Sequence, residues 1–216
     1  MKNDELFFPL LTRRPNYPLN NLGGYYSDYN KYRQHIRQDC KGRCVYCDSH
    51  ENENGGAENM NLDHFRPKSL PRFAPLSNKP ENLVWACGGC NRLKGNHWPD
   101  GNLDAAVIGD VGFIDPFESN YKEYFSIDSS GNLIPKKAPA TYMLGLLVLN
   151  RPSKRKIREL RLVKLQLIDK IQEQIGELRL LKGKGNKKNK VSLEKVIVSF
   201  TNIQQEIIKL LDLELR

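Results

Sequence analysis

Cys44-Val45-Tyr46-Cys47 and Cys87-Gly88-Gly89-Cys90 are two Cys-x-x-Cys pairs, and together they decide the fold of this chain. Two such pairs can bring four thiolates to one tetrahedral Zn²⁺ from opposite sides. A site closed by four thiolates leaves no coordination position open, so we expect the zinc to be structural. The metal would then hold together a region that has little apolar core of its own.

A pair of redox-active dithiols is the alternative interpretation of these cysteines. We favour metal binding because four of the five cysteines fall in close pairs. In addition, neither pair is expected between a strand and a helix, where a thioredoxin motif would lie. The fifth cysteine, Cys40, is expected to be an ordinary thiol. Disulfides are not expected, because cytosolic thiols are kept reduced.

Polar residues suited to hydrolytic chemistry lie between and just after the two cysteine pairs: Asp63, His64, Asn82 and Asn91. Carboxylate and amide oxygens are the ligands that Mg²⁺ prefers in proteins. An imidazole titrates near neutral pH and can therefore act as a general base. His97 follows Asn91 closely and is an alternative ligand, although its neighbours Trp98 and Pro99 favour a packed, structural histidine.

The segments that carry these residues resemble, as a set, the HNH or ββα-metal endonuclease family. They are Cys44–Cys47, Leu62–Pro67, Glu81–Leu83 and Cys87–Gly95. The resemblance covers about residues 40–96. It implies a zinc-stapled strand–strand–helix core and a metal-dependent endonuclease that hydrolyses phosphodiester bonds in nucleic acid.

The resemblance also implies a role for each polar residue. His64 would be the general base, Asp63 and Asn91 would hold one catalytic divalent ion, Mg²⁺ or Mn²⁺, and Asn82 would fix the loop that carries the base. The chemistry agrees, because hydrolysis of a phosphodiester needs a deprotonated water and a cation that neutralises phosphate charge. Four basic residues surround this site and are candidates for phosphate contacts: Arg66, Lys68, Arg92 and Lys94.

The basic charge of the chain is concentrated after residue 150. Residues 1–150 hold 17 Lys or Arg and 17 Asp or Glu, whereas residues 151–216 hold 17 and 8, which accounts for the net charge of +9. A basic surface attracts phosphate backbones by releasing counterions. Nucleic acid is therefore the expected partner, and we favour DNA over RNA. We see no signal peptide and no apolar run of about eighteen residues, so we expect a cytoplasmic protein without a membrane span.

We predict an α+β fold in three parts. Residues 1–24 form an extended N-terminal arm, residues 25–150 form the nuclease domain with its structural zinc and irregular flanks, and residues 151–216 form a basic helical hairpin. Within the second part, the pattern predicts a helix over 25–38, strands over 60–65 and 83–86, a turn at Gly88-Gly89 and a short helix from Asn91. Short strands are also expected near 112–114 and 124–127, and helical periodicity begins at Ala140.

Two amphipathic segments follow Pro152, because apolar residues recur there at steps of three and four. The first carries Ile157, Leu160, Val163, Leu167, Ile171, Ile175 and Leu178. The second carries Leu193, Val196, Phe200, Ile203, Ile207 and Leu210. Gly183-Lys184-Gly185-Asn186 interrupts the run, so an antiparallel hairpin is expected. Its tip would hold Lys182, Lys184, Lys187, Lys188 and Lys190.

A wider resemblance extends beyond the core. His64–Lys68, Asp115-Pro116 and Leu149–Pro152 resemble the small HNH nucleases that accompany ATPases in Septu-type and retron-associated anti-phage systems. It implies an effector nuclease in antiviral defence, with a partner ATPase docked on the helical part. The Lys-rich tip could instead bind phosphates directly. An alternative for the whole chain is a catalytically silent zinc module that binds nucleic acid or scaffolds a partner.

Overall fold

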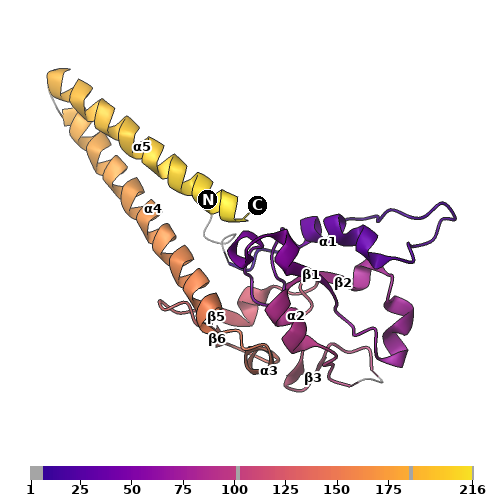
Figure 1. Ribbon diagram of the computed structural model, residues 1–216. Coiled ribbons are helices and arrows are strands. Elements are labelled where there is room, and N and C mark those ends of the chain that lie inside the picture. The colour runs from indigo at the N-terminus through magenta and orange to yellow at the C-terminus, as the bar shows by residue number, and fades with distance from the viewer. Residues whose placement is uncertain (1–6, 101–102, 185–186, 216) are drawn as a thin grey trace. The chain divides into compact units, whose positions relative to one another are not determined.

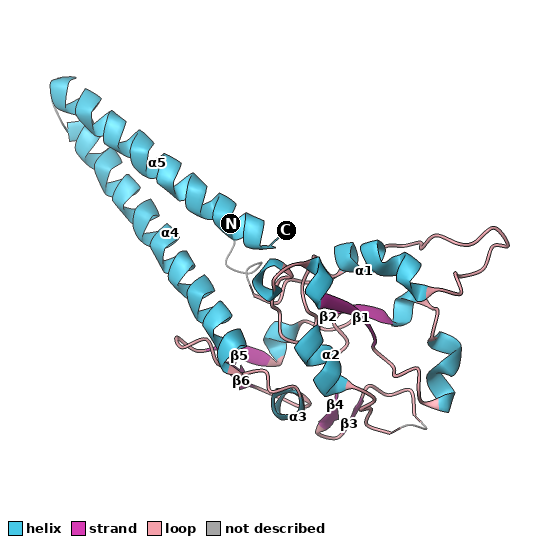
Figure 2. Cartoon of the chain, viewed as in Figure 1, coloured by secondary structure: helices cyan, strands magenta, loops and turns pink. Residues whose placement is uncertain are grey.

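The computed structural model describes residues 7–100, 103–184 and 187–215 of the chain (Figure 1). By their contacts, the described residues form two compact units, one made of residues up to Arg158 and one made of Glu159–Glu214. The first unit contains three short helices and three two-stranded sheets, and the second contains a pair of long helices (Figure 2). The division into three parts made from the sequence stays a prediction.

The elements follow one another as short strands and helices before two long helices. The helices are α1 (Arg33–Asp39), α2 (Gly88–Lys94), α3 (Ala140–Leu146), α4 (Pro152–Lys184) and α5 (Lys187–Leu215). The strands are β1 (Met60–His64), β2 (Leu83–Cys87), β3 (Val107–Ile108), β4 (Val111–Gly112), β5 (Phe125–Ile127) and β6 (Leu133–Pro135). The predicted α+β class and the C-terminal helix pair are confirmed.

The centre of the first unit is the sequence β1, β2 and α2. Strands β1 and β2 pair antiparallel, with Met60 opposite Cys87 and His64 opposite Leu83. Every residue of β2 is buried, which explains its apolar composition. Helix α2 begins directly after Cys87 and contacts both strands. The predicted order of strand, strand and helix is thus confirmed, and it places Cys87 at the end of β2 and Cys90 in α2.

Two local predictions were wrong, and strands β3 and β6 were missed. Gly88 and Gly89 do not form a turn but the first two residues of α2, although glycine is a weak helix former. The predicted helix over 25–38 becomes a 3₁₀ turn, Tyr29–Tyr32, followed by α1, because Asp28 caps the backbone N–H of Asn30. Strand β6 was not predicted, and it pairs with β5 to form a separate hairpin.

The described part of the N-terminal segment contains no helix or strand, yet it packs on the core through aromatic side chains. Phe8 is buried and stacks on Tyr121 and Phe125, with ring centroids 5.3 and 6.2 Å away. Tyr17 is buried and meets Tyr32 edge to face. Such aromatic contacts add to the apolar burial and fix this segment on the first unit.

The second unit buries only part of the apolar stripe that simple helical periodicity predicted. Leu160, Val163, Leu167, Val196 and Ile203 are each at least 39% exposed. Among the side chains of this unit that the structure describes, the buried ones are Arg161, Ile175, Ile197 and Gln204, and the amide of Gln204 donates to Gln172 on the other helix. The side chains of the predicted lysine tip lie outside the described residues. Among the described residues, no helix is both long and apolar enough to cross a membrane.

Gly112 is expected to tolerate no side chain. Its φ is +142°, and a Cβ added there would lie 2.1 Å from the Ala106 oxygen and 2.7 Å from the Val107 Cα. Gly112→Ala should therefore lower the free energy of unfolding by at least about 1 to 3 kcal/mol, measured by chemical denaturation. Gly145→Ala, in α3 with open space around it, is the matched control and should be neutral or stabilising. Equal stability of the two variants would contradict this interpretation.

Candidate functional site

The four paired cysteines converge on one point. The sulfur atoms of Cys44, Cys47, Cys87 and Cys90 lie within 4.8 Å of one another and all four side chains are buried. The Sγ atoms of Cys47 and Cys87 are 3.8 Å apart, which matches the ~3.8 Å edge of a tetrahedron with Zn–S bonds of about 2.3 Å. The cysteines are free of disulfides, so these four could hold a zinc ion. Cys40 is outside the group, and burial raises the pKa of its thiol to about 12.

The second cysteine pair lies where a strand meets a helix. Cys87 ends β2 and Cys90 is in the first turn of α2. The argument from sequence that neither pair has a strand-to-helix context was therefore wrong. Metal binding is favoured for a different reason. The sulfur atoms of both pairs form one cluster of four, and neither pair forms a separate dithiol site.

Two basic side chains lie beside the cysteine cluster: Arg151, which immediately precedes α4, and Lys154, in its first turn. Arg151 donates from Nη2 to the sulfurs of Cys90 and Cys87, at 3.3 and 3.5 Å. Lys154, which is buried, donates to Ser49 Oγ at 2.9 Å, and this hydroxyl lies 3.1 Å from Cys47 Sγ. Four thiolates around one Zn²⁺ leave two negative charges, so two nearby cations are what a buried site of this type needs.

Three of the four predicted catalytic residues line one cavity of about 290 Å³: Asp63 and His64 at the end of β1, and Asn91 on α2. The cavity is completed by Tyr29, Leu62, Pro67, Lys68, Gly95 and Asn96. A carboxylate, an imidazole and an amide from β1 and α2, which pack against each other, thus line the same space.

Asp63 is buried and held by two partners. The hydroxyl of Tyr46 donates to its Oδ2 at 2.5 Å, and the ammonium of Lys94 lies 3.4 Å from the same oxygen. Burial raises the pKa of the Asp63 carboxyl, and the Lys94 charge opposes that rise. Lys94 is fully buried and also donates to the His64 carbonyl at 2.8 Å. The predicted phosphate contact of Lys94 is therefore wrong, because its ammonium group is buried and already has partners inside the protein, the Asp63 carboxylate and the His64 carbonyl.

His64 has one ring nitrogen fixed and the other available. Its Nε2 lies 2.8 Å from the carbonyl oxygen of Ser77, which can only accept a hydrogen bond, so the Nε2 atom carries the proton and Nδ1 keeps its lone pair. The edge of the ring contacts Tyr29, with centroids 4.8 Å apart. Burial lowers the pKa of His64, which favours the neutral form of the imidazole.

Asn82 lies outside the cavity lining and binds the chain that follows His64. Its Oδ1 accepts from the Arg66 N–H at 2.9 Å, and its Nδ2 donates to the Arg66 carbonyl at 3.0 Å. Its own carbonyl accepts from the Phe65 N–H at 2.9 Å. Three hydrogen bonds from one residue thus fix the two residues after His64.

The remaining candidates differ in position. Lys68 is exposed, lines the cavity and lies over the ring of Tyr29, 4.5 Å from its centroid. Arg66 lies beside the aromatic rings of Phe65 and Trp98. Arg92 and His97 are exposed, and neither lines the cavity, so the expectation of a packed His97 was wrong.

Sequence reasoning assigned no role to four residues that now have one: Tyr46, Ser77, Lys154 and Arg151. Tyr46 is inside the first cysteine pair and Arg151 inside the segment Leu149–Pro152, so both lay within quoted motifs. Ser77 acts through its backbone carbonyl, which leaves no residue-type signal.

Removal of the Arg151 guanidinium should weaken zinc binding. Arg151→Ala deletes the hydrogen bonds to two thiolates, and loss of such a partner typically lowers metal affinity by about ten- to a hundredfold. Zinc affinity is measured by competition with a chromophoric chelator. Arg155→Ala, one turn along α4 and exposed, is the matched control and should keep the parent affinity. Equal affinities for both variants would show that Arg151 does not stabilise the cluster.

Comparison with known protein families gives a match that includes this site. Residues 44–97 match the family model described as HNH endonuclease. No curated protein and no solved structure matches the chain. The matched range contains both cysteine pairs, β1, β2, α2 and the three predicted catalytic residues that line the cavity, Asp63, His64 and Asn91. It supports a nuclease or nucleic-acid-binding role. Residues 44–97 therefore constitute an HNH endonuclease domain in which four cysteines are positioned to hold a metal.

Proposed function

We propose that this protein is a metal-dependent endonuclease that hydrolyses phosphodiester bonds of nucleic acid at the cavity beside His64. The observation that carries the proposal is that Asp63, His64 and Asn91 line one cavity within the HNH domain. A module that only binds nucleic acid has no need of a neutral imidazole beside a buried carboxylate.

His64 is the general base in this proposal. The hydrogen bond to Ser77 holds the proton on Nε2, so Nδ1 accepts the proton of the attacking water. The Tyr29 ring and the three hydrogen bonds of Asn82 limit the positions that the imidazole can adopt. A fixed base loses less entropy on reaching the reactive geometry.

Asp63 and Asn91 would hold the catalytic divalent ion, Mg²⁺ or Mn²⁺. Their donor set fits, because one carboxylate and one amide oxygen are hard ligands that leave coordination positions for phosphate and water. When bound, such an ion neutralises phosphate charge and stabilises the leaving oxygen. Tyr46 and Lys94 fix the Asp63 carboxylate from the protein side, so its orientation is set before any ligand arrives.

The substrate is proposed to be DNA rather than RNA, and the exposed ammonium of Lys68 at the cavity is a candidate for binding the phosphate backbone. An effector role in anti-phage defence, with an ATPase docked on the helical part, is supported by the wider sequence resemblance alone and stays a prediction.

The His64 assignment predicts a loss of turnover. His64→Ala should lower kcat by about a hundredfold or more with little change in KM, because a general base acts in the chemical step. The assay uses supercoiled plasmid, tRNA and single-stranded DNA with Mg²⁺ or Mn²⁺ against EDTA. His97→Ala, which alters an exposed histidine of the same domain outside the cavity, is the matched control. Cleavage by His64→Ala at the parent rate would place the base elsewhere, and binding without cleavage by the parent would favour the silent module.

The Asn91 assignment predicts a change in metal dependence. Asn91→Ala removes one proposed ligand, so the Mg²⁺ concentration for half-maximal cleavage should rise by about tenfold or more, with partial rescue at high metal. Asn96→Ala removes another amide from the same cavity and serves as the control. The assignment fails when both variants keep the parent metal dependence.

A further inference from the structure

Arg13 lies outside the matched HNH domain but binds the turn that carries Asn82. Its Nη1 donates to the carbonyl oxygen of Pro80 at 3.1 Å and to that of Leu83 at 3.2 Å, and its Nη2 donates to the Leu83 carbonyl at 3.2 Å. These two carbonyls flank Asn82 on either side along the chain. One guanidinium therefore spans the 3₁₀ turn Pro80–Asn82 and the first residue of β2.

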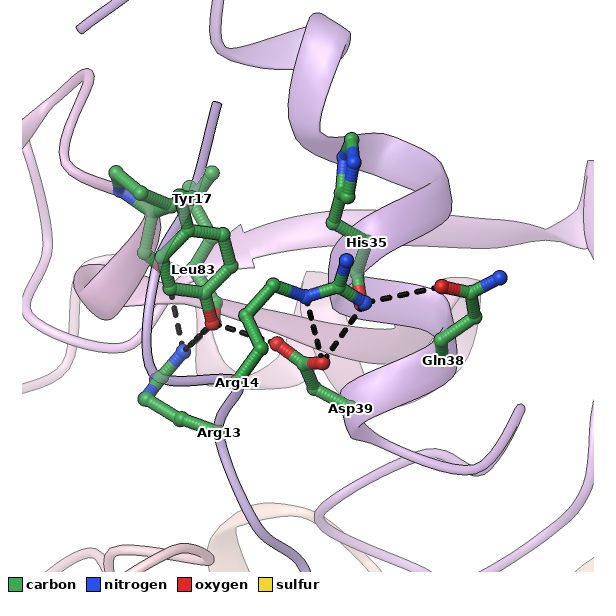
Figure 3. Close-up of polar contacts among 8 residues, drawn as sticks. Arg13, Arg14, Tyr17, His35, Gln38, Asp39 and Leu83 are labelled. Atoms are coloured by element: carbon green, nitrogen blue, oxygen red, sulfur yellow. Dashed lines mark hydrogen bonds and ion pairs between the residues drawn. The ribbon is translucent and has the colours of Figure 1, made fainter. Parts of the chain in front are cut away.

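The Arg13 guanidinium also contacts the side chains of Tyr17 and Phe117, and Figure 3 shows the polar contacts. The Tyr17 hydroxyl accepts from Arg13 Nη1 at 3.4 Å and donates to Asp39 Oδ2 at 2.6 Å. Asp39, at the end of α1, also accepts from Arg14 Nε at 2.9 Å. On its other side the Arg13 guanidinium lies over the Phe117 ring, 3.9 Å from the centroid. An arginine fixed in this way presents its donors in one plane with little freedom left to lose.

The contacts continue from Arg13 to the proposed base. Leu83 is the residue opposite His64 in the antiparallel pair, and Asn82 bonds the two residues that follow His64. Leu83 therefore pairs directly with His64, and Asn82 directly contacts Phe65 and Arg66, the two residues after it. A shift of the turn would move the strand partner of His64 and the loop after it together.

We propose that Arg13 is a positioning residue for the endonuclease reaction, acting through the Asn82 turn to hold the His64 imidazole. This inference rests on the proposed function, in which His64 is the base. The N-terminal segment is then part of the active site's support, although none of its described residues lines the cavity. Arg14 offers a built-in comparison, because it anchors the same segment to α1 through Asp39, Gln38 and the His35 carbonyl without touching the turn.

The test compares Arg13→Ala, Arg13→Lys and Arg14→Ala in the full chain. Arg13→Ala should lower kcat by about ten- to a hundredfold at nearly unchanged KM, since small misplacements of a catalytic group cost that much. Arg13→Lys should recover part of kcat, because an ammonium can still donate to one carbonyl. Arg14→Ala should keep the parent kcat. Zinc content and thermal midpoint are measured for each variant. If Arg13→Ala does not fold, the kcat of Arg13→Lys decides the test.

Amide hydrogen exchange provides a second readout that needs no activity. Arg13→Ala should speed exchange at the amides of Phe65 and Arg66 by about tenfold or more, with the peptide of Cys44–Cys47 unchanged. Equal losses of kcat in Arg13→Ala and Arg14→Ala, or unchanged exchange at these amides, would overturn the proposal. Absence of cleavage by the parent protein would count against the proposed function instead, and the exchange result would still decide whether Arg13 braces the turn.

Discussion

The convergence of four buried thiols is the constraint on which the first unit depends. They come from two segments far apart in the sequence, and both segments also belong to one core of buried apolar side chains, so the expectation of little apolar core was wrong. A tetrahedral metal site has one geometry, so binding at the thiols fixes the end of β2, the start of α2 and the turn between Cys44 and Cys47 at once. The cavity residues inherit their positions from these elements. Asp63 and His64 follow from the pairing of β1 with β2, and Asn91 follows Cys90 directly.

Charge burial is the second organising principle, and it is locally balanced. The buried carboxylate of Asp63 faces the buried ammonium of Lys94, and the thiolates face the cations of Arg151 and Lys154. An uncompensated charge in such a place would cost several kcal/mol, whereas a hydrogen-bonded pair costs much less. Buried negative charge is therefore compensated at both places. Lys94 lies beside Asp63, and Arg151 and Lys154 lie beside the cysteine cluster.

The sequence was informative wherever chemistry and spacing are local. The cysteine spacing, the two strands and the grouping of Asp63 and His64 with Asn91 could be read from neighbouring residues. The helical start at Gly88 could not, because propensity argues against it and the geometry of the cysteine site decides it. The burial of Ile197 and Gln204 in place of Val196 and Ile203 also escaped prediction. Both pairs have the same spacing, so only the partner helix distinguishes them. The contacts of Arg13 and Arg151 join segments far apart in the chain and leave no pattern in one sequence.

The contacts of Arg151 have a consequence for modularity. The family match ends at residue 97, yet the thiolates of the matched segment take their compensating charge from Arg151, immediately before α4. The segment that matches the family model therefore ends before the residues that compensate the charge of its cysteines. A fragment that ends at residue 97 would contain all four cysteines but would lack the cations that compensate the negative charge of their thiolates. We infer that the smallest transplantable unit extends at least to Lys154, because the four cysteines and the start of the long helix would have to be exchanged together.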